Sequence, residues 1–356
     1  MLFQEKIAIV DTNWGKIMSK YNTIVEKLIK QVQARHDIIA ACVYGSQIQN
    51  IATESSDLDV LLITGNGNSY RGCSIIDGVE VEYFIKSFIT IMNEIETNHK
   101  RNNPFYTSLF RNCEVLMDQN EIVLYLQNMQ QMTENQPLIL PKKQDTSTIC
   151  YYQSKWEEDP FFEHNYYVLL ECIRQYYHQK KGYSQIPFKN VLDLYQNQQM
   201  AEYYCVNLPD SAFKNFFLEC TNENSSKEEK KRYLEQMLTL INYTKLNESS
   251  SQPNYFHTER ILNYIITFVN GYKKLIRNKE KYGSILYPYH NLLEQISLLN
   301  QKCIDYHQAS ILSFTEYEQL LANPNHMGSY LSELCDWFSI QPSQYEILDF
   351  TKKHRN

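Results

Sequence analysis

The sequence predicts an α+β protein, in which a small mixed sheet with flanking helices is followed by an all-helical C-terminal domain. Short apolar runs of strand type occur between helical patterns only up to Asp118. The stretch TENQPLILPKKQDTST then holds two prolines and almost no periodicity, which is typical of a domain boundary. Beyond it, nearly every segment has helical spacing. We therefore expect a first domain at 1–133, a linker at 134–148 and a helical domain at 149–356.

The first elements follow from the spacing of apolar side chains. Residues 13–35 predict an amphipathic helix, because isoleucine, leucine, valine and tyrosine recur there at intervals of three and four. The apolar run DIIAACVY at 37–44 predicts a short buried strand, and a second strand is expected at 58–63.

A hairpin and two further helices complete the first domain. The segment CSIIDGVEVEYFI at 73–85 predicts two strands, since its Asp-Gly step is a strong turn signal. Ser87 is a suitable cap for a helix that runs to 98. CEVLMD at 113–118 predicts the last strand, and a helix follows at 121–132.

The second half predicts a helical array without an internal repeat of fixed period. We expect its helices at 149–158, 160–181, 188–199, 210–220, 227–244, 256–278, 288–309, 315–322 and 328–338.

Composition excludes several classes of protein. The formal charge of −7 argues against a protein whose main partner is nucleic acid, which would need a basic face. The nine cysteines are scattered singly without a CxxC pair, so neither a zinc site nor a disulfide framework is predicted. No apolar run is long enough to cross a bilayer, and the N-terminus lacks the pattern of a secretory signal. We expect a cytoplasmic protein without a membrane partner.

The stretch VYGSQIQNIATESSDLDVLLIT, residues 43–64, contains the first chemical signal. The strand before it ends at Tyr44, and Gly45-Ser46 begins a turn into a short helix. Such a terminus has backbone N–H groups without internal partners, and glycine lets a phosphate approach them. The pattern therefore predicts a phosphate cradle at Gly45 and Ser46.

Paired carboxylates follow on the next strand. Aspartate is a poor strand former, yet Asp57 and Asp59 stand two residues apart and so share one face. Glu80 and Glu82 also share a face on the return strand of the hairpin, and one of them can complete a cluster of three. Carboxylates beside bound phosphates are the ligands that Mg²⁺ prefers. The pattern predicts a metal site for in-line nucleotidyl transfer.

These residues resemble the nucleotidyltransferase superfamily of DNA polymerase beta type. Its pattern is Gly-Ser, a spacer, then Asp-x-Asp or Asp-x-Glu, which Gly45-Ser46 and Asp57-Leu58-Asp59 match. Within the superfamily, the order of VYGS, SD-x-acid and VEV-x-F is similar to that of antibiotic nucleotidyltransferases such as the kanamycin enzyme. The likeness spans about 38–130, and VLMDQNEIVLYL resembles the unit that closes such domains.

The resemblance implies a set of ligands and cofactors. Asp57, Asp59 and Glu80 match the metal-binding carboxylates, and we expect Glu82 to be a solvent-facing neighbour. Ser46 matches the serine that contacts phosphate. Two Mg²⁺ ions are implied, with ATP or another nucleoside triphosphate as the donor.

One position departs from the family pattern. Relatives usually carry an arginine three residues after the serine, where this chain has Gln49. Gln49 therefore brings no positive charge to the phosphates. Lys86, Arg71 and Arg174 are the alternative sources of that charge.

The predicted helix at 160–181 contains candidates for a general base. One of its faces carries a stripe of apolar and aromatic residues, which we expect to lie in the core. The opposite face carries His164, Glu171 and His178 at intervals of seven. In the family that this chain resembles, a glutamate of the helical domain often takes the proton of the attacking hydroxyl. Glu171 or Glu163 would have that role, with the acceptor in a cleft between the domains. The alternative is a solvated polar face.

We expect an enzyme that moves a nucleoside monophosphate, AMP by preference, onto a hydroxyl of a small molecule. By resemblance the acceptor is an aminoglycoside-like antibiotic, which would confer antibiotic resistance. One alternative is a toxin-like enzyme that modifies protein or tRNA, and another is a non-catalytic nucleotide sensor of the same fold. The sequence leaves open the base, the acceptor and whether the chain forms a homodimer.

Overall fold

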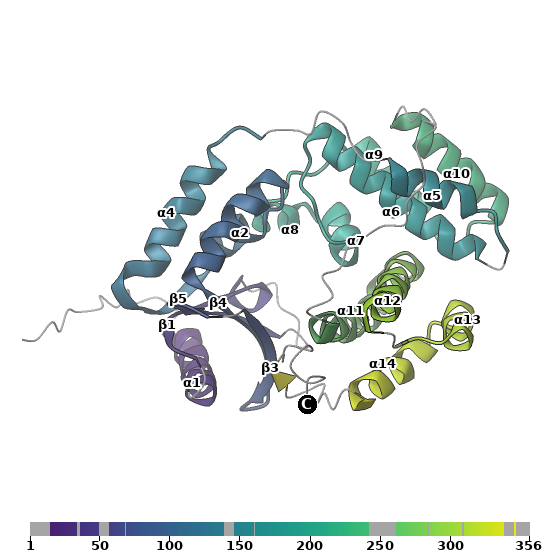
Figure 1. Cartoon of the computed structure of the whole chain (residues 1–356). Coiled ribbons are helices and arrows are strands. Elements are labelled where there is room, and N and C mark those ends of the chain that lie inside the picture. Colours follow the sequence, from purple (N-terminus) through teal and green to yellow (C-terminus); the bar gives the residue numbers. More distant parts are fainter. Residues whose placement is uncertain are drawn as a thin grey trace, which may run out of the picture. The chain divides into compact units, whose positions relative to one another are not determined.

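The computed structural model confirms the α+β class. It describes residues 15–33, 36–49, 57–67, 69–138, 146–159, 161–241, 261–282, 285–307, 310–337 and 345–346. These residues form two compact units (Figure 1). The first contains the described residues of Met1–Met92, Asn112–Leu126 and Ser343–Glu346, and the second contains the rest. The helices α2 (Phe88–Lys100) and α4 (Ile122–Glu134) begin in the first unit and end in the second. The predicted linker at 134–148 stays a prediction.

A mixed sheet forms the first unit. Its strands have the order β5-β1-β2-β4-β3-β6. The pair β2 and β4 is parallel, whereas the other neighbours are antiparallel. The strand bounds are β1 Ile38–Tyr44, β2 Leu58–Thr64, β3 Tyr70–Ile76, β4 Val79–Ser87, β5 Glu114–Asp118 and β6 Tyr345–Glu346. The sequence had not predicted β6, which is only two residues long and pairs with β3.

The turn between β3 and β4 confirms the predicted hairpin. Asp77 and Gly78 have φ angles of 52° and 78°. Positive φ at both central residues is typical of a type I′ turn, whose twist matches that of paired strands. Ile76 therefore pairs with Val79, and this pairing fixes which β4 side chains face each side of the sheet.

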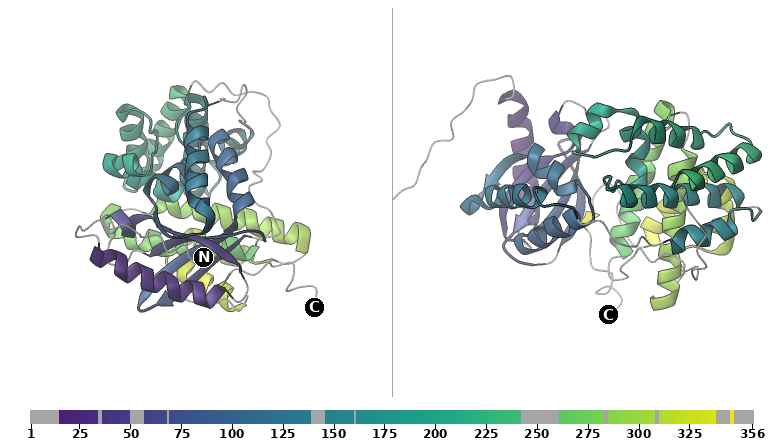
Figure 2. Two further views of the ribbon diagram at one scale, coloured as in Figure 1. Left: turned by 90° about the vertical axis from the view of Figure 1, so that its left-hand side faces the viewer. Right: turned by 90° about the horizontal axis from the view of Figure 1, so that it is seen from above.

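Helix α1 (Gly15–Val32) covers one face of this sheet, and the beginnings of α2 and α4 lie on the other (Figures 1 and 2). The α1 side chains Ile24, Val25 and Leu28 are almost wholly buried. Their sheet partners alternate along the strands, as expected for a packed face: Ala41 and Val43, then Leu58, Val60 and Leu62, then Val81, Tyr83 and Ile85. The side chains at the alternate positions of these strands, among them Asp59 and Glu82, therefore face away from α1.

The second unit consists of helices. Their bounds are α3 Phe105–Asn112, α5 Ser147–Lys155, α6 Phe162–Lys181, α7 Phe188–Gln196, α8 Gln198–Tyr203, α9 Ser211–Cys220, α10 Lys227–Leu240, α11 Ile261–Tyr282, α12 Leu286–His307, α13 Phe314–Ala322 and α14 His326–Trp337. Among the described helices, none is long and apolar enough to cross a membrane.

Three local features differ from the predicted elements, and the first is helix α3 (Phe105–Asn112), where no helix was expected. The helix expected at 188–199 is divided into α7 and α8, because Asn197 is extended and its side chain caps α8 by accepting from the Met200 N–H. Before α4, residues Gln119–Glu121 form a 3₁₀ turn in which Asn120 has a positive φ of 60°. Asparagine tolerates that conformation better than most residues.

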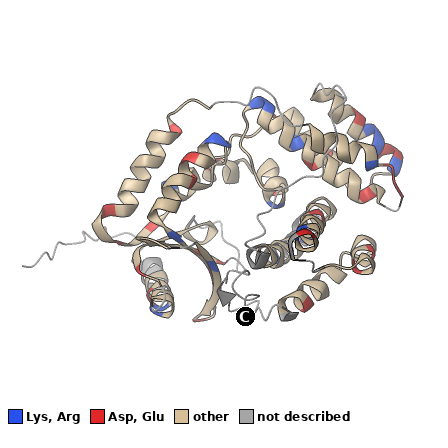
Figure 3. Ribbon diagram, viewed as in Figure 1, with Lys and Arg blue, Asp and Glu red and all other residues tan. Residues whose placement is uncertain are grey.

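Basic and acidic side chains are interspersed along α10 and its neighbours (Figure 3). Lys230 of α10 pairs with Glu163 of α6, and Lys231 pairs with Glu157. Lys227 pairs with Asp159 in the same way. The lysines of α10 are therefore neutralised locally and form no uniformly basic face.

The polar side of α6 is buried, so the alternative of a solvated face is wrong. His164, Glu171 and His178 have exposed fractions of 3%, 4% and 0%. Arg174 donates to both carboxylate oxygens of Glu171, with distances of 2.7 Å from Nε and 2.6 Å from Nη2. The Tyr287 hydroxyl of α12 donates to the same carboxylate. This face is buried because the neighbouring helix supplies hydrogen-bond partners for it.

His178 lies one turn beyond Arg174 and is neutral in this environment. Burial is the main cause that lowers its pKa to about 3, and the nearby charge of Arg174 contributes. Its Nδ1 lies 2.6 Å from the Ser184 carbonyl and its Nε2 lies 2.6 Å from the Tyr195 hydroxyl. A neutral imidazole satisfies both contacts, since Nδ1–H donates and Nε2 accepts.

Replacing Glu171 should destabilise the protein strongly. Glu171→Gln leaves the buried Arg174 guanidinium without its counter-charge, and we expect a loss of about 3 kcal/mol in the free energy of unfolding. Glu134→Gln is the control, because its ion pair with Arg111 is exposed on both sides, with side-chain exposures of 39% for Glu134 and 54% for Arg111. It should cost about 1 kcal/mol or less. Urea denaturation followed by far-UV circular dichroism measures both, and equal midpoints would contradict the structural role of Glu171.

Candidate active site

The turn after β1 has the conformation that the Gly-Ser pattern predicts. Gly45 has a φ of +85°, which favours glycine, and the 3₁₀ turn η1 (Ser46–Gln49) follows it. The Tyr21 hydroxyl of α1 donates to Gln47 Oε1 at 3.1 Å and so holds η1 against the helix. Gly45 and Ser46 therefore lie at the end of β1, beside the strand that carries the two aspartates.

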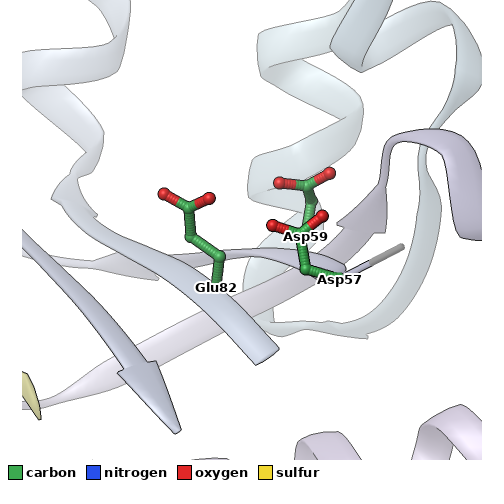
Figure 4. A group of neighbouring side chains, drawn as sticks. All are labelled: Asp57, Asp59 and Glu82. Carbon is green, nitrogen blue, oxygen red and sulfur yellow. The ribbon is translucent and has the colours of Figure 1, made fainter. Parts of the chain in front are cut away.

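Three carboxylates meet on the face of the sheet opposite α1. They belong to Asp57, Asp59 and Glu82, and one ligand oxygen from each lies within 4.8 Å of the others (Figure 4). The parallel register sets Asp59 of β2 directly opposite Glu82 of β4. Asp57 immediately precedes β2 and, two residues from Asp59, has the same parity.

Glu82, and not Glu80, completes the group of three. We expected Glu80 to be the ligand and Glu82 to be solvent-facing, but Glu82 is only 7% exposed. Glu80 pairs in register with Ile75, and its Oε1 accepts a hydrogen bond from Cys73 Sγ at 3.6 Å. The alternation of side chains correctly put both glutamates on one face. Only the register between β2 and β4 decides which of them is opposite Asp59.

Gly45 is required by its contact with Asp59 as well as by its conformation. A Cβ built on Gly45 would lie 2.1 Å from Oδ2 of Asp59, far inside contact distance. A side chain here would therefore push the Asp59 carboxylate out of the group. The glycine that opens the predicted phosphate cradle also makes room for the Asp59 carboxylate.

An arginine already binds the carboxylate group. Arg71 of β3 forms an ion pair with Glu82, and both Nε and Nη2 contact Oε1. Its guanidinium carbon lies 5.2 Å from the centre of the Phe84 ring. Three convergent carboxylates need positive charge to coexist at this distance. The donor set therefore fits a hard divalent cation with oxygen ligands.

The two glutamates predicted as general bases belong to the second unit. Glu171 is buried and saturated by Arg174, Tyr287 and Gln175. Glu163 lies in the first turn of α6 and is partly exposed beside Lys230. Arg174 is buried within that unit, where it donates to Glu171 and to the Ile186 carbonyl. A role for Glu163 or Glu171 as proton acceptor stays a prediction.

Substituting Gly45 should weaken metal binding. Gly45→Ala places a methyl group against Asp59, whereas Gly78→Ala imposes a similar left-handed strain at φ +78° with nothing within 4 Å of the new Cβ. We expect the first variant to bind Mn²⁺ at least about tenfold more weakly and the second to match the parent, because displacing one charged ligand costs about 1.5–3 kcal/mol. Titration followed by Mn²⁺ electron paramagnetic resonance distinguishes them, and equal weakening in both variants would mean that strain alone is responsible.

Comparison with known proteins finds a limited similarity of sequence. No family model matches the chain. A Methanocaldococcus jannaschii protein, "Putative protein adenylyltransferase MJ0126", is 24% identical over 90 residues, which cover 25% of this chain and 87% of the relative. A nucleotidyltransferase-like protein from Exiguobacterium sibiricum aligns over 90% of this chain and 91% of its own, with 11% identity and a TM-score of 0.33. That TM-score does not establish a common fold. The similarity to MJ0126 and the geometry of the carboxylates together support the nucleotidyltransferase superfamily.

Proposed function

We propose that this chain is a metal-dependent nucleotidyltransferase that moves AMP from ATP to a hydroxyl group. The observation that carries the proposal is the convergence of Asp57, Asp59 and Glu82 within 4.8 Å beside Gly45. Carboxylates gather in this way at sites for a divalent cation, and the cation in turn binds the phosphates of the substrate. The similarity to a protein named as an adenylyltransferase supports the choice of AMP.

The residues of the first unit would hold the donor in a defined position. Asp57, Asp59 and Glu82 would bind Mg²⁺, which neutralises phosphate charge and activates the attacking oxygen when bound. The backbone at Gly45 gives the triphosphate close access, and the Ser46 hydroxyl can donate to one of its oxygens. Gln49 adds no charge there. Binding and orientation are therefore the main work of the protein in this type of transfer.

The acceptor has two candidates of different size. A small-molecule hydroxyl, such as that of an aminoglycoside-like antibiotic, is the first and rests on the likeness of the motifs. A hydroxyl side chain of a protein is the second, and the name of MJ0126 favours it. Both use the same nucleotide site, because they differ only in what presents the attacking oxygen.

Transfer from labelled ATP tests the activity and sorts the acceptors. We expect Mg²⁺-dependent transfer of the [α-³²P] label to one class among an antibiotic panel, a total protein extract and total tRNA. Asp59→Asn should abolish both transfer and Mg²⁺-dependent ATP binding, because it removes one charge from the group with little change in shape. Unchanged ATP affinity in that variant would overturn the metal site. Mg²⁺-dependent binding without transfer to any acceptor would favour a nucleotide sensor.

The proton acceptor on α6 has a separate test. Single-turnover transfer by Glu163→Gln should fall by about 10²-fold with ATP affinity preserved, the scale of a general base. Glu163 is the better candidate because its side chain is partly exposed, whereas Glu171 is bound on both oxygens by Arg174. Transfer at the parent rate would place the base elsewhere.

A further inference from the structure

We propose that Arg71 is an exchangeable counter-ion of the carboxylate group: it holds Glu82 while no cation is bound and passes to the triphosphate when a cation takes Glu82. The inference rests on the proposed function and names a positioning residue for the donor. It concerns a residue of β3, outside the strands that carry the carboxylates.

The register of the sheet places Arg71 on the face of the carboxylates. Cys73 pairs with Glu82 and Arg71 pairs with Phe84, so all four residues share one face. The guanidinium lies over the Phe84 ring and reaches along β4 to Glu82. The side chains of Arg71 and Glu82 are 15% and 9% exposed, so the pair is largely shielded from water.

Arg71 and a metal ion compete for the same carboxylate. Both Nε and Nη2 of Arg71 contact Oε1 of Glu82, and Glu82 is one of the three ligands in the group. A divalent cation repels the guanidinium and draws on the same carboxylate charge, so each weakens the hold of the other on Glu82. Arg71 offsets the repulsion of the three carboxylates before metal binds. The same contact must weaken when metal arrives.

A triphosphate is the natural second partner of Arg71. Mg²⁺ is bound through carboxylates and substrate phosphates together, so the phosphates lie next to the ligands that Arg71 leaves. A planar guanidinium binds phosphate oxygens in pairs, as it binds carboxylates. The Phe84 ring supports the guanidinium face and allows a small pivot instead of a full withdrawal into water.

Removal of Arg71 should therefore change two affinities in opposite directions. Arg71→Met should bind Mn²⁺ alone about threefold more tightly or better, because a shielded ion pair no longer competes. It should bind Mn²⁺–ATP about tenfold more weakly, because the variant lacks one charge-assisted contact between Arg71 and the triphosphate. Electron paramagnetic resonance of free Mn²⁺ measures the first, and calorimetry with ATP at saturating Mn²⁺ measures the second.

Lys27→Met is the control. It removes a charge of the same sign from the same unit, but Lys27 belongs to α1, which covers the opposite face of the sheet, and it pairs with Asp77. We expect both of its affinities to stay within about twofold of the parent, since a charge on that face is screened from the carboxylates. Thermal unfolding with and without Mn²⁺ gives a second readout, in which Arg71→Met gains more from the cation than the parent does.

The outcomes separate this inference from the proposed function. If Arg71→Met binds Mn²⁺ no more tightly than the parent, or binds Mn²⁺–ATP equally well, the counter-ion role is overturned while the metal site stands. If the two variants shift both affinities equally, the effect is one of general charge and the role is also overturned. If the parent binds no Mn²⁺ at all, the metal site and the role of Arg71 are both wrong.

Discussion

The parallel pairing of β2 with β4 is the constraint on which the candidate site depends. Asp59 and Glu82 come from strands joined through a hairpin, and only this pairing brings them directly opposite each other. Because Glu82 alternates along β4 with residues that pack against α1, a slip of β4 by one residue would turn its carboxylate into the apolar core. The free energy that fixes the register therefore comes from burying Val60, Val81 and their neighbours. Packing of the apolar core therefore fixes the positions of the carboxylates.

Charge balance is the second constraint. Three carboxylates within 4.8 Å repel one another, and a fold keeps such a group only with positive charge at hand. Arg71 supplies part of that charge from β3, and a bound cation would supply more. The close packing of Gly45 against Asp59 restricts where the carboxylates can move. Sterics and charge thus act on the same few atoms, and a small change at Gly45 or Arg71 should move the carboxylates.

The helical unit contains a buried pair of opposite charges instead of a group of like charges. Glu171 and Arg174 form a buried pair with Tyr287, and the pKa of Tyr287 is raised well above its usual value mainly by burial. A buried pair of this kind is costly to break, though it is not in itself a large source of stability. Its donors and acceptors instead fix how α6 meets α12. A polar stripe on a helix can therefore be an interior contact rather than a solvated face or a catalytic one.

The sequence by itself determined most of the elements and pointed to the residues of the candidate site. The period of apolar residues predicted α1, the strands and most helices, and the Asp77-Gly78 turn predicted the hairpin, because these depend on local conformation. The Gly-Ser and Asp-x-Asp spacing predicted the aspartates of the site for the same reason. Only the tertiary structure decided that Glu82, and not Glu80, lies opposite Asp59, that Arg71 is the cation beside it and that Glu171 is saturated. Each of these depends on which strand or helix lies opposite, and that choice is set by packing between segments distant in the chain, which local periodicity does not specify.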